Sequence, residues 1–134
     1  MLGDLIGRND NRDTGRRVLD AGDGHVVVEV SFEADGSYYG TAVKGFGTYE
    51  SELRADGSLR GEGQGVDMTA DGQSVTWRAH GIGHFTEGGG TSWRGALFFS
   101  TASSQLDRLN HIVGVFEYEA TPDGKSTGAY YEWK

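Results

Sequence analysis

The sequence has no cysteine and one proline among its 134 residues. The absence of cysteine excludes a disulfide framework, a thiolate zinc site and a cysteine nucleophile. The single proline, without any three-residue repeat, excludes a collagen-like chain even though 23 residues are glycine, more than twice the ordinary usage of about 7%. A chain of this length is expected to form one domain, 1–134, because domains usually contain about 100–150 residues.

Long apolar runs and an excess of positive charge are also missing. The start, MLGDLIGRNDNRDTGRR, has no apolar run of the roughly 7–15 residues that a secretory signal needs. No stretch approaches the ~20 apolar residues of a membrane helix. With 12 Lys and Arg against 20 Asp and Glu, the net charge is −8, and an acidic surface repels phosphate backbones and anionic lipid. We therefore expect a cytoplasmic protein without nucleic-acid or membrane partners.

Four Asp-Gly pairs stand out, at 35–36, 56–57, 71–72 and 123–124, between runs rich in Val, Thr, Tyr, Phe and Trp. Asp-Gly between such runs is a strong hairpin signal. The pattern predicts an all-β antiparallel meander that closes into a barrel of roughly eight strands, because closure removes unpaired edges. The serines at 103–104 and the Leu106/Leu109 spacing predict one short helical turn within 103–110. Residues 1–24 are polar, and we expect them to be partly ordered, with a short strand at Val18 and Leu19.

The side chains that face inward follow from the turns, if each Asp-Gly pair is a two-residue loop. The turn at 35–36 then places Val28 opposite Val43. The turn at 56–57 places Tyr49 opposite Gln64, and the turns at 71–72 and 123–124 set the later strands in the same way. The facing of the strand at 92–101 stays open. The candidate interior site consists of Tyr49, Ser51, Glu62, Gln64, Trp77, Tyr118, Tyr131 and Trp133.

Glu62 is the candidate catalytic residue of this set. An apolar barrel raises the pKa of an inward carboxyl, which suits a general acid or base. The alternative is a structural carboxylate, held by Tyr49, Ser51 or Gln64. If Glu62 faces inward, its neighbours Gly61, Gly63 and Gly65 lie on the outer face of the strand. A large side chain such as Arg78 or His80 would then lie flat across these glycines.

Neither a metal nor a cofactor is expected. His80 and His84 are four residues apart, which on a strand is about 13 Å, too far for one ion. The run Gly61-Glu62-Gly63-Gln64-Gly65 lies in a strand and leads into no helix, so it does not predict a phosphate cradle.

Several segments, VEVSFEADGSYYG, GEGQGVDMTADG, SWRGALFFSTASSQLDRLN and VFEYEA with YEWK, resemble a family of small bacterial and archaeal proteins without an assigned function. More distantly, the meander resembles the allene-oxide-cyclase-like barrel, a calycin or lipocalin type. The resemblance implies a barrel, and some small bacterial members of that barrel class are cofactor-free cyclases of polyketide-like substrates. None of their catalytic motifs maps onto this chain, so no residue role is carried over.

Three functions stay open at this point. The first is a small barrel that binds a small, mostly apolar ligand in its interior, with Glu62 and Gln64 orienting it. The second is a cofactor-free cyclase or isomerase in which Glu62 moves a proton. The third is a filled barrel that serves in structure or oligomerisation, and a homodimer is a partner that the sequence leaves open.

Overall fold

The computed structural model describes residues 2–134, which form a closed antiparallel barrel of eight strands in meander order. The strands are β1 (Leu2–Asp20), β2 (Val27–Tyr38), β3 (Thr41–Leu53), β4 (Leu59–Thr69), β5 (Ser74–Phe85), β6 (Thr91–Thr101), β7 (Gly114–Ala120) and β8 (Lys125–Trp133). Two short 3₁₀ turns accompany them, η1 (Gly22–Gly24) and η2 (Asp107–His111). The all-β meander, its closure and the short helical turn are confirmed.

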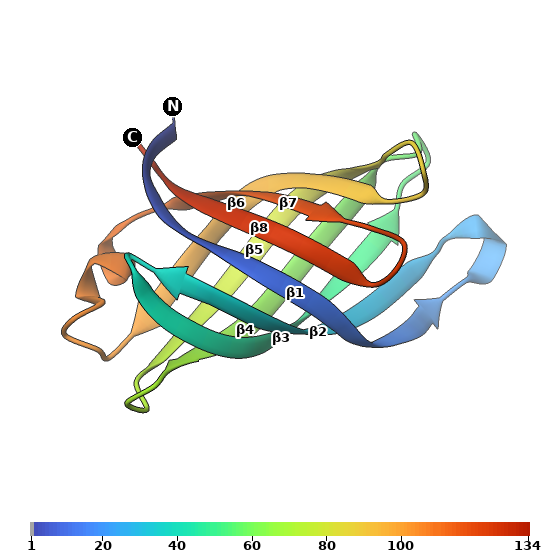
Figure 1. The fold of residues 1–134 in the computed structure, drawn as a ribbon. Coiled ribbons are helices and arrows are strands. Elements are labelled where there is room, and N and C mark those ends of the chain that lie inside the picture. Colours follow the sequence, from blue (N-terminus) through green and yellow to red (C-terminus); the bar gives the residue numbers. More distant parts are fainter. Residues whose placement is uncertain (1) are drawn as a thin grey trace.

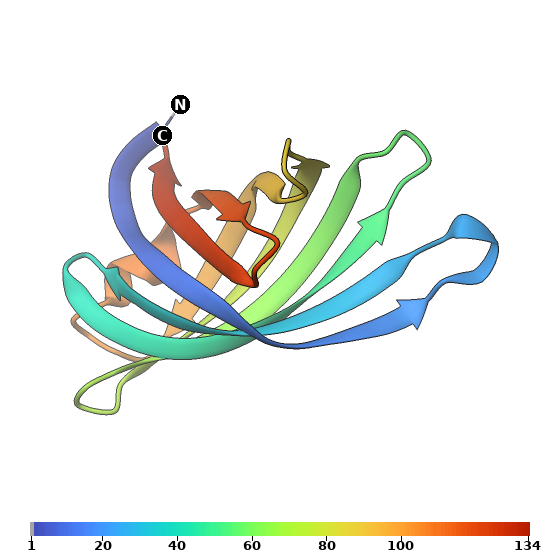
Figure 2. The same ribbon diagram turned by 45° about the vertical axis from the view of Figure 1, so that its right-hand side comes forward.

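β1 closes the barrel, because it pairs with β2 on one side and with β8 on the other. It occupies most of the segment 1–24 that we expected to be only partly ordered, so the short strand predicted at Val18 and Leu19 was far too short. The β1–β2 hairpin projects past the other hairpins at the end opposite η2, and the start of β1 lies beside the end of β8 at the η2 end (Figures 1 and 2).

The sequence predicted a turn at Asp35-Gly36, but the turn between β2 and β3 lies elsewhere. Both residues are inside β2, and the turn is Tyr39-Gly40, with φ of 48° and 84°. Val28 therefore pairs with Ser51 and not with Val43. The predicted faces of β2 and β3 survive, because the register moves by an even number of residues.

The other three Asp-Gly turns are where we expected them, but each loop is longer by one residue. In the β3–β4 turn, the Gly57 N–H donates to the Arg54 carbonyl at 3.0 Å, and Gly57 has a φ of 86°. This is a type I turn followed by a glycine bulge, the usual three-residue hairpin loop. Thr69 to Gly72 and Thr121 to Gly124 repeat the pattern.

A register that is wrong by one residue reverses the faces of a strand. Tyr49 pairs with Gly63, so β4 turns its glycines inward and its Glu62 and Gln64 outward. The β4–β5 loop adds a second one-residue error, which cancels the first, so Trp77 faces inward as predicted. The β7–β8 loop pairs Phe116 with Tyr130, and the predicted inward facing of Tyr131 and Trp133 was wrong.

The packed core lies at the η2 end of the barrel. Leu106 and Leu109, from the segment around η2, are fully buried and plug this end. They pack with residues from β1, β2, β3, β5 and β6, namely Ile6, Tyr38, Val43, Val75, Leu97 and Phe99. The plug leaves the middle and the hairpin end of the barrel as the place for a site.

Candidate functional site

A partly open cavity of about 80 Å³ lies inside the barrel beyond the packed core. All strands except β1 give it apolar or aromatic side chains or glycine backbone, and β1 contributes the Asn9 side chain. Its principal side chains are Asn9, Phe32, Tyr49, Trp77, Ala79, Trp93, Leu97, Phe116, Tyr118 and Tyr130.

Glycines make room for the two tryptophans of this cavity. A Cβ on Gly65 would lie 2.5 Å from the Trp77 ring, and a Cβ on Gly83 would lie 2.6 Å from the Trp93 ring. A Cβ on Gly61 would meet the same Trp93 ring at 2.7 Å. The glycines of β4 therefore seat aromatic rings on the inner face. The expectation that they receive Arg78 or His80 on the outer face was wrong.

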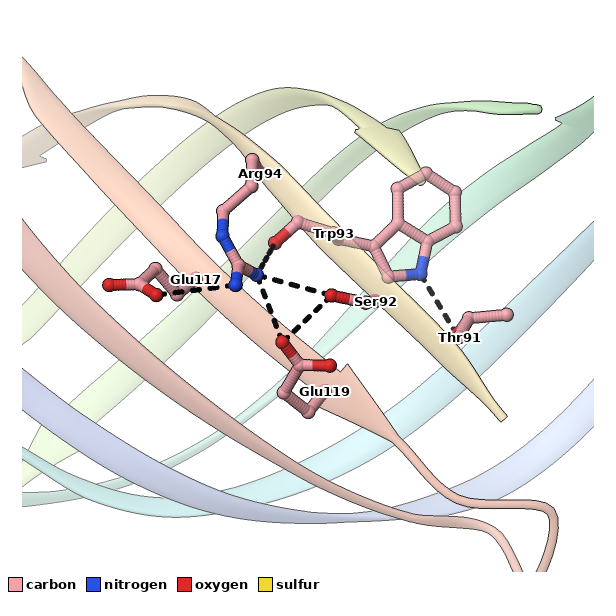
Figure 3. Close-up of polar contacts among 6 residues, drawn as sticks. All are labelled: Thr91, Ser92, Trp93, Arg94, Glu117 and Glu119. Atoms are coloured by element: carbon pink, nitrogen blue, oxygen red, sulfur yellow. Dashed lines mark hydrogen bonds and ion pairs between the residues drawn. The ribbon is translucent and has the colours of Figure 1, made fainter. Parts of the chain in front are cut away.

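The aromatic rings support one another around Tyr49. Its ring centroid is 6.2 Å from that of Trp93 and 6.2 Å from that of Tyr118, both in edge-on geometry. On the other side, Phe32 stacks on Trp77 at 6.2 Å. The Trp93 indole N–H donates to the Thr91 hydroxyl at 3.1 Å, so this ring is fixed at its edge (Figure 3). The apolar wall is thus preorganised.

Successive side chains of β6 point alternately to the cavity wall and to the outer surface. Trp93 and Arg94 extend to opposite sides of the strand in Figure 3. Arg94 pairs on the outside with Glu119 at 2.9 Å and with Glu117 at 3.3 Å. Trp93, Leu97 and Phe99 are buried, which settles the facing of the strand at 92–101.

Burial raises the pKa of the Tyr49, Tyr118 and Tyr130 hydroxyls. At neutral pH these tyrosines therefore stay protonated and can each donate one hydrogen bond. Asp13 and Arg16 of β1 lie near Tyr49 and pair with each other at 3.0 Å. The hairpin side of the cavity is accordingly more polar than its centre.

Asp67 is a buried acid apart from the cavity, with only 6% of its surface exposed. The Tyr38 hydroxyl donates to its carboxylate, and Gly45 leaves it space, because a Cβ there would lie 2.0 Å from the Asp67 Oδ1. Burial raises the pKa of the Asp67 carboxyl, and the Tyr38 hydrogen bond offsets this only in part.

We expect Asp67→Asn to stabilise the protein at pH 7 by an amount on the order of 1 kcal/mol. A folded-state pKa above the unfolded value of ~3.9 favours the folded state below that value, and this contribution is lost as the pH rises through the folded pKa. The asparagine of the variant does not ionise, so the stability of the variant does not fall as the pH rises through this pKa. Thermal midpoints of the two proteins from pH 3 to pH 8 should converge at the acid end and separate above it. Parallel curves would contradict the burial of an ionisable group here.

The structure places four of the predicted site residues, Tyr49, Glu62, Trp77 and Tyr118, around the cavity, although the Glu62 side chain is mostly exposed. Ser51 is half-buried on the inner side of β3 but does not line the cavity. Tyr131 lies on the outer side of β8, and Trp133 is 62% exposed. The three-residue loop before β8 explains both corrections, because it brings Tyr130 inward in place of its neighbour.

Glu62 was predicted to be inward and catalytic, and its side chain is instead 58% exposed. It lies 3.7 Å from Arg60 and 3.6 Å from His80. Gln64 is also exposed. Gln64 does not line the cavity, and Glu62 borders it with a side chain that is mostly exposed. Glu62 therefore lacks the apolar surroundings on which its predicted role as an acid or base depended.

Sequence reasoning missed Asn9, Trp93 and Tyr130 as site residues. The set Trp93, Leu97 and Phe99 is more apolar than the alternate set Arg94, Ala96, Phe98 and Ser100, and this difference was a usable signal for β6. Asn9 lies in the segment expected to be partly ordered, and nothing in its local sequence marks it as inward.

Across residues 2–134, no three histidine, aspartate or glutamate side chains are grouped so that they could hold a metal ion. The same residues contain no helix with both the length and the apolar character needed to cross a membrane.

Comparisons with known proteins show the fold. No protein-family model matches the chain, and no curated protein matches it in sequence. A β-barrel-like protein from Acinetobacter baumannii is similar in structure, with a TM-score of 0.83, 12% identity, and coverage of 100% of this chain and 96% of that one. A protein of unknown function from Rhodopseudomonas palustris has a TM-score of 0.81, 13% identity, and coverage of 96% and 94%.

An enzyme from Penicillium herquei has a similar barrel, with a TM-score of 0.68, 16% identity, and coverage of 98% of this chain and 96% of that one. At these identities the likeness concerns the fold alone. The neighbours agree with the resemblance to small barrel proteins without an assigned function.

Proposed function

We propose that the barrel binds a small, flat and largely apolar molecule in its interior. The observation that carries this proposal is the cavity between Trp77 and Trp93, whose walls are aromatic rings and glycine backbone. Small barrels hold either packed side chains or one small ligand. Here the packed side chains and the plug occupy the η2 end, and the space lies beyond them.

The size of the cavity limits the ligand. Its volume of about 80 Å³ is below that of an engineered apolar cavity of about 150 Å³ that holds benzene. Because the cavity is partly open, a single aromatic ring would extend from it toward the hairpin end. We therefore expect molecules of one ring, and weaker binding of larger ones.

The cyclase or isomerase function has less support. Its proposed acid or base, Glu62, has a mostly exposed side chain, and the enzyme with a similar fold shares only 16% of its residues with this chain. A completely filled barrel is also less well supported, because the cavity remains after the core has packed.

The three tryptophans allow a direct test by NMR. Trp77 and Trp93 line the cavity, whereas Trp133 is exposed and serves as an internal control. On titration with p-xylene, a flat apolar probe, we expect the indole N–H signals of Trp77 and Trp93 to shift and that of Trp133 to stay. Equal shifts of all three, or none, would contradict binding in the interior.

A cavity-filling variant sharpens this test. Ala79 lines the cavity, and leucine there would occupy the space of the ligand. We expect Ala79→Leu to weaken p-xylene binding at least about tenfold, which corresponds to ~1.4 kcal/mol. Ala96 pairs with His80 on the outer side of β6, so Ala96→Leu is the matched control and should bind normally. Equal affinities of the two variants would place the probe elsewhere.

A further inference from the structure

Three buried polar groups without hydrogen bonds lie in neighbouring strands beside the cavity. Among the described residues, the Asn11 Oδ1, the Tyr118 hydroxyl and the Ser126 hydroxyl have no hydrogen-bond partner. Asn11 and Ser126 are directly paired between β1 and β8. The Tyr118 hydroxyl lies close to the hydroxyls of Ser126 and Tyr49, but these contacts do not have the geometry of a full hydrogen bond. We call these three residues the polar patch.

The polar patch is part of the barrel interior. Asn11 and Ser126 are 6% and 5% exposed, respectively, and Tyr118 lines the cavity. Tyr49, on the opposite wall, is 6.2 Å from the Tyr118 ring between centroids. Asp13 lies close to both tyrosines. The patch therefore lies on the hairpin side of the cavity, between the hairpin end of the barrel and the apolar wall.

Unpaired polar groups in a buried position are costly and need a reason. A buried donor or acceptor without a partner costs about 1–3 kcal/mol, and natural proteins contain few of them. Three in one patch beside an otherwise apolar cavity indicate that a partner is supplied from outside the chain.

The chemistry of the patch selects the kind of partner. Asn11 offers an unused acceptor, and the hydroxyls of Tyr118 and Ser126 can each donate and accept. Asn11 already uses its amide to donate to the Asn9 Oδ1 at 3.2 Å. The Asp13 carboxylate adds another acceptor nearby, but Arg16 neutralises its charge at 3.0 Å. A neutral group that both donates and accepts, a hydroxyl, matches this set better than a cation.

We infer that the polar patch binds a hydroxyl group of the ligand, so that the barrel takes a flat apolar molecule with a hydroxyl at its hairpin-side end. This inference rests on the proposed function, because it needs a ligand in the cavity. It adds an orientation: the apolar part lies against Trp77 and Trp93, and the hydroxyl lies beside Tyr118.

The test compares two probes of equal size and shape, p-cresol and p-xylene, by NMR titration of the full chain. Because water solvates the two probes differently, the quantity of interest is the ratio of their dissociation constants in each variant. Tyr118→Phe and Ser126→Ala remove one hydroxyl each. Tyr131→Phe makes the same chemical change on the outer side of β8 and is the matched control.

We expect the preference for p-cresol over p-xylene to fall about tenfold in Tyr118→Phe, the effect of one lost buried hydrogen bond. Ser126→Ala should reduce it in the same direction, and Tyr131→Phe should leave it unchanged. Thermal midpoints of the Tyr118→Phe and Ser126→Ala proteins without ligand should change little, because each lost hydroxyl makes no hydrogen bond of full geometry.

Two results would overturn the inference while leaving the proposed function intact. One is an unchanged preference in Tyr118→Phe, with both probes still bound near Trp77 and Trp93. The other is a fall of more than about 4 °C in the midpoint of unliganded Tyr118→Phe, which would show that the hydroxyl already has a partner. Failure of both probes to bind the unaltered protein would instead reject the proposed function itself.

Discussion

Replacing Gly65 by alanine is expected to lower the free energy of unfolding by about 2 kcal/mol. The new Cβ would lie 2.5 Å from Cε2 and Cζ2 of the Trp77 ring and 2.7 Å from its Nε1. The ring cannot easily retreat, because Phe32 stacks on it at 6.2 Å and the Gly47 backbone lies against its edge. The variant should also shift Trp77 toward the cavity and weaken p-xylene binding.

Urea denaturation measures this effect, with Gln64→Ala as the control. Gln64 is the exposed neighbour of Gly65 on β4, and truncation of an exposed side chain usually changes stability by less than about 0.5 kcal/mol. On an outward face, alanine in place of glycine would stabilise the strand by about 0.5–1 kcal/mol. If the Gly65→Ala protein were as stable as the original, the result would indicate that the β4 glycines face outward.

The second large effect is expected at Arg108, which holds the η2 segment to the barrel. Its guanidinium donates to the buried Glu132 carboxylate and, at 2.8 Å, to Asp4. It also lies over the Tyr39 ring, 4.8 Å from the centroid. Glu132 is only 4% exposed, so Arg108→Met would leave a buried charge without its cation. We expect Arg108→Met to lower the free energy of unfolding by more than the loss of an exposed surface ion pair does, because only the Arg108 side of the pair is in contact with water.

Two further variants separate the buried pair from ordinary surface charge. Arg60→Met removes the exposed Arg60–Glu62 pair, whose atoms are 3.7 Å apart, and should cost less than about 1 kcal/mol. Combining Arg108→Met with Glu132→Gln should recover much of the lost stability, because the uncompensated charge is then gone. Equal unfolding free energies of the Arg108→Met and Arg60→Met proteins would contradict this role of Glu132.

The candidate site shows where prediction from the sequence fails. An Asp-Gly pair fits a two-residue turn and also a three-residue turn with a glycine bulge, because both need a glycine at positive φ. Gly57, Gly72 and Gly124 meet this need with φ of 84–86°. The residue types do not show which loop forms, and the difference of one residue moved Glu62 from the predicted interior to the surface.

Part of the interior was predicted correctly only because two errors in the predicted register cancelled each other. Trp77 faces inward because two one-residue errors, in the β3–β4 and β4–β5 loops, compensate each other. A single such error lies between β7 and β8, with no second error to cancel it, so Tyr130 took the place predicted for Tyr131. Large aromatic residues close to glycine-rich strands were a better guide than the exact register.

The sequence by itself determined the class of the fold, the order of its hairpins and the position of the helical turn, because these depend on local composition and alternation. The tertiary structure decided the faces of β4 and β8, the pairing of β1 with β8, and the plug of Leu106 and Leu109. These features depend on contacts between residues distant in the chain and on the closing of the barrel, which fixes one register for all strands together.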